Sequence, residues 1–496
     1  MAALVAAAGC SQPAPNAPGT LTLGALDDAP GLDPAQHPDA TAQGIAREVF
    51  ETLVRLRPGS FEVEGDLARS WSVSADGTTW TFVLWPGLKF SNGTPLDASA
   101  VKANLDRWRL SNDPNRQGLD YPAYAQHFGG FDSQSIIDDV RVDGPTQLVI
   151  HTRTPFAALL RELALPSFGI GSPIAIGNDY KLYDQLPVGS GRYRVSEYQA
   201  GDHVTLSPNP MWRGPPAPVP SVIVRIIPDP ETAVLALEKE DVDAVVDPTP
   251  DVAHDISSRQ GMHLVRWPSD ALCYLLFDLD RPPFSDPRAR RAVALALDRK
   301  AIAANYGDPA VRPARGWMPP GMLGADPNVT QLAYDPHAAR SLLERAGAAH
   351  ARLTLYYPAT ASALLPDPSA VAQQIQSELT GVGLVVSLQA TDATELPSSS
   401  GGALALGIVA ADSGDPVDLL APLAGSWSDP AFVAGATQAA TTIAERQRAQ
   451  IYRRLDQLIA DRVAAIPLVH PTRAAAVSTR ATVRLDSALL PRSAAE

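Results

Sequence analysis

The sequence predicts an α/β fold, in which short strands alternate with helices along most of the chain. From Thr20 onward, alternating apolar residues indicate strands, and apolar residues spaced by three or four indicate helices. The 46 prolines and 35 glycines predict many loops, which argues against a helical bundle. With 496 residues, 45% of them hydrophobic, the chain is long enough for roughly two to four domains.

Period-two alternation predicts strands at residues 20–23, 203–207 and 221–227. The segment Ser72–Leu84 is typical of a β-hairpin, because an Asp-Gly turn signal lies at residues 76–77. On its second strand, Trp80, Phe82 and Leu84 share one face. We expect that face to point into a core.

Helical spacing predicts three clear helices, at residues 288–305, 371–379 and 445–463. Val293 and Leu297 mark the apolar face of the first helix. The second helix is expected to stop at Gly381 and Gly383, since glycine often ends a helix.

Composition and motifs exclude several classes of function. The net charge of −14, without a Lys/Arg cluster, argues against a nucleic-acid partner. Two cysteines cannot build a disulfide scaffold, and Cys273 lies in an apolar stretch typical of a core. The nine histidines form no metal-binding pair on a recognisable helix, and no catalytic or phosphate-loop signature is present. We therefore expect no metal and no cofactor. A pair of glycosidase carboxylates stays open, because its members need not be adjacent in sequence.

The N-terminus is similar to the end of a bacterial lipoprotein signal. Residues 1–10 read MAALVAAAGC, an apolar run with small residues before Cys10, although a charged region before the run is missing. The following residues, up to Gly19, are rich in Ser, Pro and Ala and suit a tether. No other stretch approaches the roughly 20 apolar residues of a membrane span. We therefore expect lipid attachment at Cys10 and anchoring to the membrane, without insertion through it.

A series of motifs, in a shared order, resembles the extracytoplasmic solute-binding proteins of peptide/nickel ABC importers. The most specific is residues 86–96, PGLKFSNGTPL, which is similar to the family pattern kGvkFhdGtPl. Further similar segments lie at residues 31–34, 49–54, 66–82, 187–193, 274–277, 283–299, 334–347 and 464–468. The resemblance covers nearly the whole chain after residue 20.

This resemblance implies a two-lobed periplasmic-binding-protein-like fold (type II, cluster C) with an extra subdomain in the first lobe. The implied limits are a signal remnant and tether at 1–19, lobe I at 20–262 with a subdomain at about 49–174, lobe II at 263–469, and a return to lobe I at 470–496. It also implies a non-enzymatic receptor, because the family captures solutes and does not transform them.

The resemblance also implies candidate ligand-binding residues. Asp412, in the segment GIVAADSGDP, matches the aspartate that pairs with a peptide's α-ammonium in the family. Asp415 follows it beside a proline. It is a second candidate ligand contact, and it is also expected to shape the turn. By position, Gly31, Leu32 and Trp427 are further candidates for the cleft.

Two departures from the family pattern concern the ligand. Val409 stands where peptide binders often have tryptophan, and residues 362–364 carry no arginine where dipeptide binders pair a ligand's carboxylate. The resemblance therefore favours a ligand that is longer than a dipeptide or shaped differently.

The leading hypothesis is an extracytoplasmic, lipid-anchored, monomeric receptor that captures peptides and delivers them to ABC permease subunits in the membrane. One alternative is a receptor of the same fold for haem, a metal chelate or a glycoside. An alternative from another class is an extracytoplasmic hydrolase.

Overall fold

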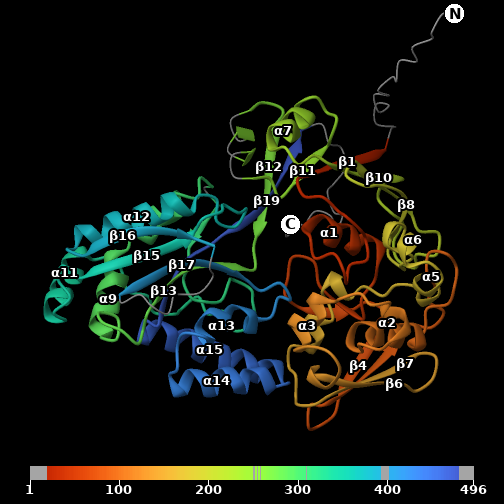
Figure 1. Ribbon diagram of the computed structural model, residues 1–496, viewed down its shortest axis with the longest axis horizontal. Coiled ribbons are helices and arrows are strands. Elements are labelled where there is room, and N and C mark those ends of the chain that lie inside the picture. Colours follow the sequence, from red (N-terminus) through yellow and green to blue (C-terminus); the bar gives the residue numbers. More distant parts are fainter. Residues whose placement is uncertain are drawn as a thin grey trace, which may run out of the picture.

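The computed structural model describes residues 19–249, 252–253, 255–256, 259–308, 310–392 and 402–479. Strands and helices alternate along these residues and build two lobes, on the left and on the right of Figure 1. The predicted α/β class is confirmed. The expected attachment residue Cys10, most of the tether and the end of the C-terminal segment lie outside the described residues. No helix in the described ranges is long and apolar enough to cross a membrane.

The first lobe is built on a seven-stranded sheet with the order β12-β19-β11-β1-β10-β9-β8. The central strand β1 runs parallel to both of its neighbours, and β19, from the end of the chain, pairs antiparallel with β11 and β12. The strands of this sheet are β1 (Thr20–Ala25), β8 (Tyr193–Gln199), β9 (His203–Pro208), β10 (Ser221–Ile226), β11 (Ala244–Val246), β12 (Met262–Pro268) and β19 (Thr472–Ser478).

The subdomain of the first lobe contains a four-stranded antiparallel sheet with the order β4-β5-β7-β6. The predicted hairpin is confirmed, since β4 pairs with β5 across a turn in which Gly77 has a φ of 76°. Trp80, Phe82 and Leu84 are buried in the core of the subdomain, as expected. The strands are β4 (Ala68–Val73), β5 (Thr79–Leu84), β6 (Ile137–Val142) and β7 (Gln147–Thr152), with a separate pair, β2 (Val54–Leu56) and β3 (Val63–Gly65).

The second lobe is built on a six-stranded sheet with the order β14-β18-β13-β17-β15-β16. Residues of β13 alternate between two cores. Cys273 and Leu275 pack with residues of α9 and α12, whereas Leu272 and Tyr274 pack with residues of α13 to α15. Figure 1 shows these two groups of helices on opposite faces of the sheet. The strands are β13 (Ala271–Phe277), β14 (Arg312–Pro313), β15 (Arg352–Pro358), β16 (Val385–Thr391), β17 (Ala403–Ala410) and β18 (Ala465–His470).

Helices cover the sheets of both lobes. In the first lobe they are α1 (Ala40–Val49), α2 (Ala98–Arg109), α3 (Pro122–Phe128), α4 (Leu159–Glu162), α5 (Pro173–Asn178), α6 (Tyr180–Gln185) and α7 (Pro230–Glu238). In the second lobe they are α9 (Pro287–Ala296), α10 (Arg299–Ala304), α11 (Pro336–Arg345), α12 (Pro368–Gly381), α13 (Pro416–Ala424), α14 (Pro430–Thr441) and α15 (Glu445–Arg462). The helices predicted at residues 371–379 and 445–463 are confirmed as α12 and α15.

The single helix predicted at residues 288–305 is wrong, because the structure has two helices there. α9 ends at Ala296, and α10 begins at Arg299. Asp298 separates them: its side chain accepts hydrogen bonds from the backbone N–H groups of Lys300 and Ala301, which caps α10. Periodicity alone missed the break because apolar residues continue across it.

Along the described residues, the chain crosses between the two sheets twice, at Ser269–Asp270 and at Pro471. Residues 262–268 pair with β19 over their full length, so they belong to the first sheet. We therefore place the proposed limit between the lobes at Ser269 and not at residue 262. The two crossings contact each other, since the Oγ of Ser269 donates a hydrogen bond to the backbone oxygen of Pro471 at 2.7 Å.

Candidate functional site

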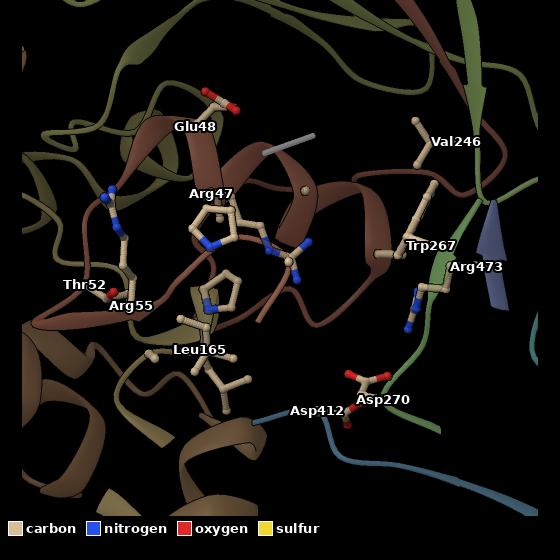
Figure 2. Close-up of a pocket in the computed structure, with 18 of the residues that line it drawn as sticks. Arg47, Glu48, Thr52, Arg55, Leu165, Val246, Trp267, Asp270, Asp412 and Arg473 are labelled. Atoms are coloured by element: carbon tan, nitrogen blue, oxygen red, sulfur yellow. The ribbon is translucent and has the colours of Figure 1, made fainter. Parts of the chain in front are cut away.

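A cavity of about 700 Å³ lies between the two lobes (Figure 2). The first lobe contributes residues of β1, α1, the segment after α1, and β19, and the second lobe contributes the residues that precede β13 and follow β17. This volume is within the range of about 300–1,000 Å³ that is typical of small-molecule sites. Because both lobes line it, a bound ligand would contact both.

Asp412 is a free carboxylate on the second-lobe wall of the cavity. It lies two residues after the end of β17. The backbone N–H of the intervening Ala411 donates to the backbone oxygen of Asp270 at 3.1 Å. The next turn contains Gly414, with a φ of 71°. The Asp412 side chain is exposed and has no hydrogen bond or ion pair with any residue that the structure describes. An acceptor for a cationic group therefore faces the cavity.

Asp270 lies beside Asp412 and adds a second negative charge. Its Oδ1 is buried and has no hydrogen-bond partner among the described residues. Burial raises the pKa of Asp270, and the charge of Asp412 raises it further, while the nearby Arg473 and Arg47 oppose the increase. A ligand cation near these two carboxylates would relieve their mutual repulsion.

Arg47 and Arg473 face the same cavity from the first lobe. Nη1 of Arg473 donates to Oδ2 of Asp247 at 3.2 Å, so its charge is compensated. Arg47, in the last turn of α1, is exposed to the cavity and makes no hydrogen bond or ion pair within the described residues. Enclosure by the surrounding protein and the charge of Arg473 lower the pKa of Arg47, which stays charged at neutral pH. Figure 2 shows its guanidinium pointing into the cavity.

A second pair of carboxylates, Glu51 and Asp66, also lines the cavity. Nη2 of Arg213 donates to Oε1 of Glu51 at 2.6 Å, and Nη1 of Arg55 lies 3.7 Å from Oδ1 of Asp66. Burial and the charge of Glu51 raise the pKa of Asp66 to about 7. Because arginines already contact both carboxylates, we do not include them among the proposed ligand contacts.

Asp415, predicted as a ligand contact, is fully buried and does not line the cavity. Its carboxylate accepts hydrogen bonds from both terminal nitrogens of Arg448, at 2.5 and 2.8 Å. It also accepts from the backbone N–H of Val417 at 3.0 Å, which caps α13. Its expected role in the turn agrees with this cap, and we remove it from the proposed ligand contacts.

Gly31 and Leu32 also do not line the cavity. Leu32 is 1% exposed and packs in the core of the first lobe. The adjacent Asp33 is buried and receives two hydrogen bonds from Arg107, at 2.8 and 3.0 Å. A Cβ at Gly31 would overlap with the side chains of His37 and Asp184, which pair with each other at 2.9 Å. The segment thus supports the fold, and neither residue stays among the proposed ligand contacts.

Trp427 lies after α13 and does not line the cavity. It packs against Phe432, with ring centroids 4.8 Å apart, at the edge of the core beneath β13. Of the predicted site residues within the described ranges, the cavity contains Asp412 alone.

Sequence reasoning missed Arg47, Trp267, Asp270 and Arg473. Asp270 and Trp267 lie just before the apolar run 271–277. A carboxylate directly before a buried strand could have indicated Asp270 as a candidate site residue. Arg473 reaches the cavity because the chain returns to the first sheet in β19. Arg47 carried no local signal, since an arginine in the last turn of a helix is common.

The chain is similar to known proteins over most of its length. The family model described as bacterial extracellular solute-binding proteins, family 5 middle, matches residues 62–430. Di/tripeptide-binding protein 2 of Pseudomonas aeruginosa (strain UCBPP-PA14) is 28% identical over 469 residues, 89% of this chain and 87% of that protein. The probable D,D-dipeptide-binding periplasmic protein DdpA of Escherichia coli (strain K12) is 27% identical over 383 residues, 74% of this chain and 70% of that protein.

Among solved structures, HbpA2 from Haemophilus parasuis has a TM-score of 0.83 at 22% identity, covering 93% of this chain and 96% of that chain. The unliganded open form of the periplasmic murein tripeptide-binding protein MppA has a TM-score of 0.79 at 18% identity, covering 93% of each chain. These likenesses confirm the two-lobed fold predicted from the sequence.

Proposed function

Because the chain belongs to the bacterial extracellular solute-binding proteins of family 5, we propose that it is a receptor that captures peptides and delivers them to an ABC importer. Two of its relatives are named for binding di- and tripeptides and D,D-dipeptides. In this proposal the protein acts outside the cytoplasmic membrane as a monomer, held by a lipid on Cys10. Its partners are the peptide and the permease subunits, and it catalyses no reaction.

The observation that carries this proposal is the carboxylate of Asp412 on the wall of an interlobe cavity, which no residue in the described ranges pairs with. A peptide's α-ammonium needs an acceptor when it leaves water, and a carboxylate supplies a charge-assisted hydrogen bond. Asp270, beside it, strengthens the negative potential at that position. The pair therefore suits a cationic amine.

The connection between the lobes supports capture by closure. Two chain crossings link the lobes, and they lie side by side at Ser269 and Pro471. Bending at two adjacent crossings would rotate one rigid lobe towards the other, as in hinge closure around a ligand. A ligand that contacts both walls would then favour the closed form.

The first prediction concerns Asp412. Asp412→Asn keeps the shape of the side chain but removes its charge, and we expect peptide affinity to fall by well over tenfold, because breaking such a pair costs on the order of 2–5 kcal/mol. Mass spectrometry of ligand released from the purified protein identifies the peptide to use, and isothermal titration measures its affinity. Asp280→Asn is the matched control, since Asp280 is exposed and does not line the cavity.

The same titration with an N-acetylated peptide separates amine recognition from a general effect. Acetylation should weaken binding to the wild type and add little in Asp412→Asn, as for two halves of one interaction. Equal affinity of Asp412→Asn and wild type would reject the amine contact. Release of haem, a metal chelate or a glycoside, without any peptide, would reject the peptide proposal itself.

A further inference from the structure

The arginines that line the cavity differ in whether the protein already compensates them. Four have an acidic partner: Arg55 with Glu64, Arg57 with Glu62, Arg161 with Glu445, and Arg473 with Asp247. Arg47 and Arg192 have no hydrogen bond or ion pair with the part of the chain that the structure describes. An uncompensated cation on the wall of a cavity is available to an anionic group of a ligand.

Arg47 is better placed than Arg192 to act together with Asp412. Arg47 and Asp412 line the same cavity from different lobes, and Figure 2 shows both side chains, with Asp270 beside Asp412. Arg47 is exposed to the cavity, whereas the Nε of Arg192 is buried against the first lobe. Asp412 and Arg47 thus face one cavity of about 700 Å³, a volume typical of small-molecule sites.

We propose that Arg47 binds the free carboxylate of the ligand while Asp412 binds its ammonium, so that the cleft selects short peptides by both termini. The inference rests on the proposed function and adds the group that sets specificity. A guanidinium can bind a carboxylate through two parallel hydrogen bonds, which suits a chain terminus. Arg47 and Asp412 lie on different lobes, since α1 belongs to the first lobe and β17 to the second. A peptide with both charges would therefore hold the lobes together.

This assignment changes the expectation about the ligand. Residues 362–364 carry no cation, which favoured a ligand that is not closed at both ends. The structure brings a cation to the cavity from α1, far away in the sequence. A di- or tripeptide then has a partner for each of its terminal charges.

A competing role for Arg47 is to pair with Asp270 when the lobes close. Asp270 is near Arg47, and one of its oxygens has no hydrogen-bond partner in the described residues. In that case Arg47 would favour closure around any peptide, whether its C-terminus is a free carboxylate or an amide. The two roles therefore differ in how they respond to removal of the ligand's carboxylate.

The second prediction tests these roles with peptides in two chemical forms. A panel of di- and tripeptides, each as the free acid and as the C-terminal amide, is titrated into wild type, Arg47→Gln, Arg192→Gln and Arg69→Gln. We expect the wild type to bind the acid over tenfold more tightly than the amide, and Arg47→Gln to bind both as weakly as the wild type binds the amide. Arg192→Gln should keep the preference for the acid. Arg69 is exposed outside the cavity, so Arg69→Gln controls for the change in net charge.

Each outcome decides the question. If Arg47→Gln weakens acid and amide equally, Arg47 serves closure and the inference fails. It also fails if Arg47→Gln keeps the preference for the acid, or if the wild type has no such preference. If the wild type binds no peptide in either form, the proposed function fails and the inference fails with it. Thermal unfolding of Arg47→Gln near the wild-type temperature would show that the variant is folded, as expected for a side chain without a hydrogen bond or ion pair to the described residues.

Discussion

Asp412 and Asp415 lie in one short turn but have opposite environments. Asp412 is exposed to the cavity, whereas Asp415 is fully buried and bound by both terminal nitrogens of Arg448. Tyr452 contacts the same pair, with its hydroxyl 3.0 Å from Arg448 and 3.3 Å from Asp415. A buried charge with such partners fixes the start of α13, and so it fixes the position of the turn that carries Asp412.

The third prediction follows from this buried pair. Asp415→Ala leaves the Arg448 guanidinium buried without its counter-charge, which typically costs about 3–5 kcal/mol. Urea denaturation should show that loss in the free energy of unfolding, and Asp280→Ala should show almost none. A loss for Asp415→Ala no larger than for Asp280→Ala would contradict the structural role of the pair.

At the scale of elements, the break between α9 and α10 depends on one capping side chain. Asp298 accepts hydrogen bonds from the N–H groups of Lys300, at 3.0 Å, and Ala301, at 3.3 Å. Its own N–H donates to Glu378 of α12 at 3.0 Å, which ties the break to a neighbouring helix. Two short helices thus replace one long helix because a local hydrogen-bond acceptor competes with helix continuation.

The fourth prediction concerns this cap. Asp298→Ala should lower the free energy of unfolding by about 1 kcal/mol, because two N–H groups at the start of α10 lose their acceptor. Asp298→Asn keeps an oxygen in that position and should cost less. Chemical denaturation of both variants measures the difference, and an equal loss in the two would argue against capping.

At the scale of the whole molecule, the lobes also contact each other away from the two crossings. The N–H of Ala157 donates to the oxygen of Ala440 at 2.9 Å, and Nη2 of Arg161 donates to Glu445 at 2.7 Å. Asp418 of α13 lies near Glu162 of the first lobe, and burial together with the charge of Glu162 raises the pKa of Asp418 to about 7. Negative charges on the two lobes therefore repel each other across this contact.

The fifth prediction concerns the pH dependence of this contact. The pKa of Asp418 is higher in the folded protein than the value of 3.8 expected when unfolded, so its contribution to stability is full below pH 4 and is lost as the pH rises through 7. Asp418→Asn removes the ionisable group, and with it the loss of folding stability at high pH. We expect it to raise the free energy of unfolding at pH 8 by about 1–3 kcal/mol, allowing for partial exposure, and to change it much less at pH 4.5. Urea denaturation at both pH values measures this, and an equal effect at the two would contradict the assignment.

Features that depend on neighbouring residues could be predicted from the sequence. Alternation and an Asp-Gly turn predicted the hairpin of β4 and β5, and helical spacing predicted α12 and α15, because short-range sterics and hydrogen bonds set these patterns. The ordered motifs also predicted the two-lobed fold. Asp412 was predicted from its motif, and it lines the cavity just after a strand that pairs within the second sheet.

Which charged side chains lack a partner among the described residues depends on how distant segments pack together. Asp415 is compensated by Arg448, and Leu32 is buried in the core of the first lobe, through contacts with distant segments that no local pattern reports. Arg47 faces Asp270 and Asp412 because the chain crosses between the lobes and brings α1 and β17 to one cavity. Whether a charge binds a ligand or holds the fold depends on what lies within a few ångströms of it, and that is set by the packing of the whole chain.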